Sequence, residues 1–91
     1  MPTKAEKEHY RKVAELGCSL CRHQGQPGTP AELHHIRRTS KRSLAPVIPL
    51  CPYHHRFPNT SIHGMGRKRF EREYDITEET LLEQTLQLIG E

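Results

Sequence analysis

Two pairs of potential metal ligands occur in the sequence with the same spacing. Cys18 and Cys21 are separated by two residues in "CSLC", and Cys51 and His54 by two residues in "CPYH". This spacing lets two side chains of one tight turn reach a single ion. Three cysteines and one histidine form a usual tetrahedral ligand set for structural Zn²⁺. The sequence therefore predicts a structural zinc site built by these four residues.

Three other interpretations of the cysteines stay open. "CSLC" could be a redox pair, but Cys51 and His54 would then have no role, and no βαβ pattern surrounds the motif. His23 could replace His54 as the fourth zinc ligand, although the paired spacing would be lost. The cysteines could also be reduced side chains of a dry core. An intramolecular disulfide framework would leave one of the three cysteines over, so we expect a reducing cytosol.

Two pairs of adjacent histidines are the second chemical feature. His34 and His35 lie in "AELHHI", and His54 and His55 lie in "CPYHHR". Successive side chains of a strand point to opposite faces, so His34 and His35 would lie in different environments. If His54 binds zinc, His55 points elsewhere on its short helix. One histidine from the strand and one from the helix could then converge on a second ion, with a third histidine close by.

Short secondary-structure elements must position these residues. A capping box of Thr3 and Glu6 and a stop at Gly17 predict a helix over residues 3–16. The predicted order after it is a cysteine knuckle (18–21), a loop, a strand (31–36), a basic loop (37–46), a strand (47–50), a short helix from Pro52, a loop (58–66), a helix (67–74) and an amphipathic helix opened by Thr77. The predicted class is α+β, with a single domain (1–91), a ββα core (about 31–57) and a helical C-terminal part (67–89).

Composition limits the size of the core. The chain has 91 residues, of which 33% are apolar, and it has no Trp. A core this small suggests a metal cross-link, a partner chain, or both. The N-terminal stretch "MPTKAEKEHYRK" has no apolar segment, so we expect no signal peptide. No run approaches the ~20 apolar residues of a membrane span, so we expect no membrane association.

Charge is distributed unevenly along the chain. Residues 22–69 hold nine basic residues against one acidic residue, a net charge of +8, together with six of the seven histidines. Residues 70–91 hold one basic residue against seven acidic residues, a net charge of −6. The middle segment is therefore suited to a polyanion such as DNA. An ordinary solvated surface is the alternative interpretation of the charge.

The combined motifs resemble the HNH endonuclease superfamily. In that superfamily a strand with a histidine pair is followed by a cysteine- and histidine-bearing helix, and a zinc knuckle braces them; here "CSLC", "ELHHI" and "VIPLCPYHHR" match. More narrowly, "LGCSLC", "TPAELHHIR", "IPLCPYHHR", "SIHG" and "RKRFEREY" resemble the small phage nucleases related to the recombination enhancement function protein, over roughly residues 4–89. The resemblance implies a zinc-braced ββα-metal (His-Me finger) fold. It also implies a metal-dependent DNA endonuclease of little sequence specificity, acting in phage recombination or DNA processing in the bacterial host cytoplasm, with a recombinase filament as a candidate partner.

The resemblance also implies a role for each histidine of the proposed second site. His34 would bind the catalytic divalent ion, His35 would be the general base, and His55 would be the second metal ligand. Strand alternation agrees with this division, because it separates the base from the ion-binding side chain. Asn59 or His63 would complete the ligand set. The expected ion is Mg²⁺ or Mn²⁺, with Zn²⁺ or Ni²⁺ as alternatives.

The sequence departs from the family pattern at one point. The family has an Asn before the second strand, and here residues 43–46 read "SLAP", so backbone groups or Ser43 would replace it. This departure supports the alternative of a non-catalytic, zinc-braced DNA-binding module. A protein-interaction domain that uses the acidic C-terminal helix is a third possibility. The side chains expected to contact DNA phosphates are basic: Arg37, Arg38, Lys41, Arg42, Arg56, Arg67, Lys68 and Arg69.

Overall fold

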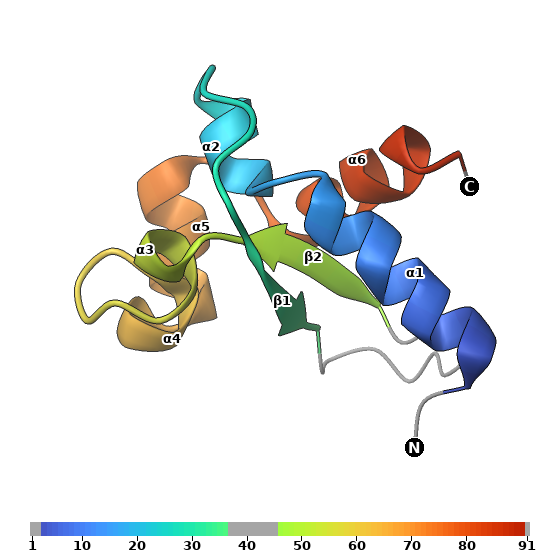
Figure 1. Cartoon of the computed structure of the whole chain (residues 1–91). Coiled ribbons are helices and arrows are strands. Elements are labelled where there is room, and N and C mark those ends of the chain that lie inside the picture. Colours follow the sequence, from blue (N-terminus) through green and yellow to red (C-terminus); the bar gives the residue numbers. More distant parts are fainter. Residues whose placement is uncertain (1–2, 37–45, 91) are drawn as a thin grey trace.

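Eight short elements make up the part of the chain that the computed structural model describes, residues 3–36 and 46–90 (Figure 1). In chain order they are α1 (Lys4–Glu15), α2 (Ser19–His23), β1 (Glu32–His35), β2 (Val47–Leu50), α3 (Pro52–His55), α4 (Ile62–Met65), α5 (Arg67–Tyr74) and α6 (Glu78–Leu88). The predicted α+β class is confirmed, and both strands lie where the sequence placed them. Among these helices, none combines the length and the apolar character that a membrane crossing requires.

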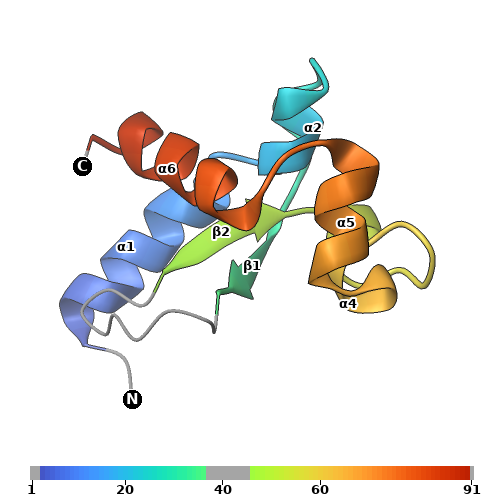
Figure 2. The ribbon, with the colours of Figure 1, turned by 180° about the vertical axis from the view of Figure 1, so that it is seen from behind.

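The two strands form an antiparallel sheet at the centre of the fold. Glu32 lies opposite Leu50, and His34 lies opposite Ile48. All four residues of β2 are buried, because α1, α2 and α6 all contact this strand. Figures 1 and 2 show α1 and α6 beside the sheet toward one end, and α3, α4 and α5 beyond the other end. On β1, His34 is buried and the next residue, His35, is exposed, as strand alternation predicts.

A capping box at Thr3 begins the N-terminal helix α1. The Thr3 hydroxyl accepts a hydrogen bond from the Glu6 N–H at 3.1 Å, and the Thr3 N–H donates to Glu6 Oε1 at 2.8 Å. This confirms the predicted capping box.

Gly17 ends the helix. It has φ +80°, and a Cβ there would lie 3.1 Å from the Thr29 carbonyl oxygen. Glycine is therefore the residue that lets the helix stop and the chain reach Cys18.

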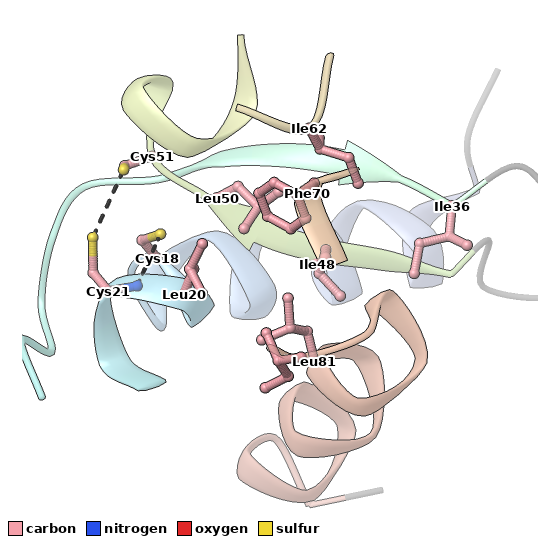
Figure 3. Close-up of a cluster of buried hydrophobic side chains, with 11 residues drawn as sticks. Cys18, Leu20, Cys21, Ile36, Ile48, Leu50, Cys51, Ile62, Phe70 and Leu81 are labelled. Carbon is pink, nitrogen blue, oxygen red and sulfur yellow. Dashed lines mark hydrogen bonds between the residues drawn. The ribbon is translucent and has the colours of Figure 1, made fainter. Parts of the chain in front are cut away.

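The core is small and includes the cysteines. Figure 3 shows Leu20, Ile48, Leu50, Phe70 and Leu81 gathered between the sheet and the helices, with the three thiols at one edge. These five apolar side chains are completely buried. Burying such a side chain stabilises the folded state by about 1.5–3 kcal/mol, and the described residues supply few of them. The three cysteines are therefore part of the buried core and add to its size.

Two segments differ from the prediction. "CSLC" is not an isolated knuckle, because Cys18 caps α2 and its Sγ accepts the Cys21 N–H at 3.4 Å. Residues 58–66 were predicted to be loop throughout, which is wrong, because they contain α4. Ser61 caps α4 by accepting the Gly64 N–H at 2.9 Å. Only one turn of helix forms, so hydrophobic periodicity could not reveal it.

Gly64 allows α4 to lie close to the preceding segment, and this generates a test. A methyl group at Gly64 would collide with the carbonyls of Phe57 and Pro58. Because these obstacles are backbone atoms, we expect Gly64→Ala to lower the free energy of unfolding by about 3 kcal/mol. Urea denaturation measures this value. Gly25→Ala is the control, because Gly25 has φ +89° and open space around it, and it should cost only about 1 kcal/mol. Equal effects of the two substitutions would contradict this account of α4.

Candidate metal centres

The four predicted zinc ligands come together in one buried cluster. The ligand atoms of Cys18, Cys21, Cys51 and His54 lie within 4.8 Å of one another. Cys21 Sγ lies 3.8 Å from Cys51 Sγ, and a dashed line joins the two atoms in Figure 3. His54 Nδ1 lies 3.6 Å from Cys18 Sγ and from Cys21 Sγ, and 3.3 Å from Cys51 Sγ. Tetrahedral Zn²⁺ separates its sulfur ligands by about 3.8 Å and a sulfur from a nitrogen by about 3.5 Å, so the donors fit this ion.

The cluster joins two helices at equivalent positions. Cys18 caps α2 and Cys21 lies in its first turn, while Cys51 caps α3 and His54 lies in that helix. Each ligand pair is therefore a cap residue and the residue three positions later. His23, the alternative fourth ligand, is exposed at the end of α2 and is not part of this cluster.

Burial shifts the pKa of two members of the cluster, Cys18 and His54. Burial raises the pKa of the Cys18 thiol to about 12, so this thiol keeps its proton unless a cation is close by. Burial lowers the pKa of His54, so its imidazole is neutral near pH 7, which is the form that binds a metal. All three cysteines are free thiols. The cluster is therefore suited to binding a cation rather than to acid–base chemistry.

A second cluster contains three histidines from three different elements. His34 of β1, His55 of α3 and His63 of α4 have ligand atoms within 4.8 Å of one another. Their ring centroids are 5.4 Å apart for His34 and His55, 5.2 Å for His34 and His63, and 4.8 Å for His55 and His63. His34 is buried, His55 is half-buried and His63 is exposed. Unlike the cysteine cluster, this one opens to solvent, which is typical of metal sites that bind a substrate.

Two of the three histidines have a carboxylate partner that the sequence did not reveal. His34 Nε2 lies 2.6 Å from Glu78 Oε2, and His55 Nδ1 lies 2.8 Å from Glu32 Oε1. Histidine ligands of metals commonly donate their other ring N–H to a carboxylate in this way. Within residues 3–36 and 46–90, the buried His34 Nδ1 has no hydrogen-bond partner. A cation between the three rings would satisfy this atom, so the cluster fits a metal ion.

His35, the predicted general base, is not one of the three clustered histidines. His35 is exposed at the end of β1, with its ring 5.9 Å from that of Tyr10 on α1. Asn59 is exposed in the segment between α3 and α4. The structure therefore brings His63 to His34 and His55, and the chemical roles of all these residues remain predictions.

The described basic residues predicted to contact DNA fall into two groups. Arg56 Nε lies 3.0 Å from Glu32 Oε2, and Arg67 lies 3.1 Å from Glu71. Hydrogen bonds from His55 and Arg56 lower the pKa of Glu32, so this carboxylate stays ionised at neutral pH. Lys68 and Arg69 are exposed in the first turn of α5. The remaining predicted contacts lie outside the described residues: Arg37, Arg38, Lys41 and Arg42.

These features define a small α+β protein with two candidate metal centres. Residues 2–90 match the family described as recombination enhancement, RecA-dependent nuclease. Because the match spans nearly the whole chain, this protein belongs to that family. The family description implies a nuclease that acts in recombination. A search of curated proteins finds no match to this chain.

The cysteine cluster leads to a test by zinc content. Protein dialysed against a weak chelator, to empty the open three-histidine cluster, should keep about one Zn²⁺ per chain, since the four ligands complete a closed tetrahedral site. Cys51→Ser should lose this zinc and the cooperative unfolding transition, because metal binding and folding are coupled in such small domains. Elemental analysis and circular dichroism measure the two effects. His23→Ala is the control and should change neither, whereas a folded, zinc-free Cys51→Ser protein would contradict the structural role.

Proposed function

We propose that this protein is a metal-dependent DNA endonuclease of the HNH type, in which β1, β2 and α3 form the ββα-metal unit. The observation that carries the proposal is the convergence of His34, His55 and His63, whose ligand atoms lie within 4.8 Å of one another at a solvent-accessible position. The family membership supports nuclease activity independently of this geometry. His35 follows directly after His34 on the same strand.

In this proposal the three-histidine cluster holds the catalytic divalent ion. When bound, the ion neutralises charge on the scissile phosphate and stabilises the departing 3′ oxygen. Glu78 lies 2.6 Å from His34 and Glu32 lies 2.8 Å from His55, and carboxylates commonly accompany histidine ligands of a metal in this way. Three imidazole nitrogens favour Zn²⁺ or Ni²⁺ over Mg²⁺, whose preferred ligands are oxygen atoms, and Mn²⁺ lies between these cases.

His35 is the proposed general base. An exposed imidazole can accept a proton from a water molecule and return it to solvent, as a general base must. The deprotonated water would attack the phosphorus atom while the bond from phosphorus to the 3′ oxygen breaks. Hydrolysis would leave 5′-phosphate and 3′-hydroxyl ends. The sequence continues with the basic stretch "RRTSKR", which is suited to contact DNA phosphates.

The substrate and partner follow from charge and from the family. Lys68 and Arg69 lie at the N-terminal turn of α5, where the helix dipole adds to the attraction of phosphate. Such contacts position a DNA backbone without reading bases, so we propose little sequence specificity. In keeping with the family description, we propose that activity depends on a RecA-type recombinase filament.

Cleavage of supercoiled plasmid DNA tests the proposed catalytic roles. With a recombinase filament and Mg²⁺, Mn²⁺, Ni²⁺ or Zn²⁺, the wild-type protein should nick DNA. His35→Ala should slow nicking by about 10²–10⁴-fold, since this is the usual contribution of a general base, and should leave metal binding unchanged. Gel electrophoresis of a time course measures the rate.

The same assay separates the remaining alternatives. His63→Ala should abolish nicking and weaken metal binding, whereas Asn59→Ala should retain both if His63 is the third ligand. A non-catalytic DNA-binding module would bind DNA but give no nicking with any of these metals, with or without the filament. That result would overturn the proposed enzyme.

Salt dependence tests the proposed phosphate contacts. Binding to duplex DNA should weaken steeply with salt, since each neutralised phosphate contributes about −0.9 to the slope of log K against log salt. Lys68→Ala and Arg69→Ala should each make this slope about one unit shallower. Arg67→Ala should change it less, because Arg67 already pairs with Glu71 at 3.1 Å. Fluorescence anisotropy at several salt concentrations measures the slope, and a flat dependence would contradict the basic contact surface.

A further inference from the structure

We infer that Glu78, on the C-terminal helix α6, is a positioning residue of the three-histidine centre. This inference rests on the proposed function and deepens it. Glu78 is distant in sequence from all three histidines, and nothing in its local sequence marks it as part of a site. In this role α6 would position a ligand of the metal centre, although it supplies none of the three proposed ligands.

The contact between Glu78 and His34 is buried and short. His34 Nε2 and Glu78 Oε2 are 2.6 Å apart, and only 7% and 5% of the two side chains are exposed. An ionised Glu78 carboxylate would accept this hydrogen bond, which would place the imidazole proton on Nε2. The lone pair of Nδ1 is then available to a ligand, and this buried atom has no hydrogen-bond partner among the described residues. Glu78 therefore selects the tautomer in which His34 can bind a cation through Nδ1.

The fold holds the Glu78 carboxylate in place from several sides. Thr77 caps α6 by accepting the Thr80 N–H at 3.1 Å, which fixes the first turn of the helix. The Glu78 N–H donates to Glu71 Oε2 at 2.8 Å and so joins α6 to α5. One turn further along, Leu81 is completely buried in the core. The carboxylate therefore has little freedom to move away from His34.

Glu32 provides a matched comparison within the same centre. It makes the equivalent contact with His55, through Nδ1 at 2.8 Å, which leaves Nε2 of that ring for the ion. Its side chain is 34% exposed, however, and it is shared with Arg56. Hydrogen bonds are stronger in a buried, low-dielectric environment. Loss of the Glu78 carboxylate should therefore weaken metal binding more than loss of the Glu32 carboxylate.

Metal binding by the full-length, zinc-loaded protein tests this inference. Titration with Mn²⁺, followed by the electron paramagnetic resonance signal of the free ion, should give a Kd about 10–100-fold higher for Glu78→Gln than for wild type. Glu32→Gln should raise the Kd less than about tenfold. Glu79→Gln is the control, because it removes an exposed carboxylate from the same helical turn, and its Kd should stay close to the wild-type value.

The tautomer of His34 gives a second readout that a purely structural role would not move. Nitrogen NMR of the Mn²⁺-free wild-type protein should show His34 protonated at Nε2, and Glu78→Gln should lose this preference. An unchanged Kd in folded Glu78→Gln, or wild-type His34 protonated at Nδ1, would overturn the inference. If Glu78→Gln does not fold, the tautomer of His34 in the wild-type protein alone tests the inference. If His34→Ala binds Mn²⁺ as tightly as wild type, the proposed metal centre itself fails.

Discussion

The structure depends on the cluster of three cysteines and one histidine that connects α2 to α3. Only 33% of the residues are apolar, so the buried surface is small for a stable fold. The α3 helix is a single turn, Pro52–His55, and such a helix does not form by itself in water. Cys51 and His54 hold this turn against α2, and that attachment sets the direction in which His55 points.

Both histidine pairs divide between different environments for a simple geometric reason. Adjacent residues are about 100° apart around a helix and point to opposite faces of a strand. His54 therefore lies in the cysteine cluster while His55 reaches the three-histidine cluster. In the same way His34 is buried in the second cluster while His35 is exposed. One turn of helix thus supplies side chains to two candidate metal centres, one closed and one open to solvent.

The sequence predicted the features that depend on local spacing. The capping box at Thr3, both strands, the short helix from Pro52 and the four residues of the cysteine cluster could be found because each involves residues a few positions apart. It did not predict Glu78, because a carboxylate that reaches across from another helix has the same local pattern as a surface acid. It also left the third ligand open between Asn59 and His63, with His63 at least as good a candidate, because α4 is a single turn with no periodic signal.

The central claim is that two separate metal centres share α3. Anomalous X-ray diffraction from crystals of the zinc-loaded protein soaked in Mn²⁺, measured at the absorption edges of both metals, tests it most directly. We expect Zn²⁺ to be bound by Cys18, Cys21, Cys51 and His54. We expect Mn²⁺ to be bound by His34 Nδ1, His55 Nε2 and His63. Mn²⁺ bound elsewhere, or no second ion with His34 Nδ1 left without a ligand, would contradict it.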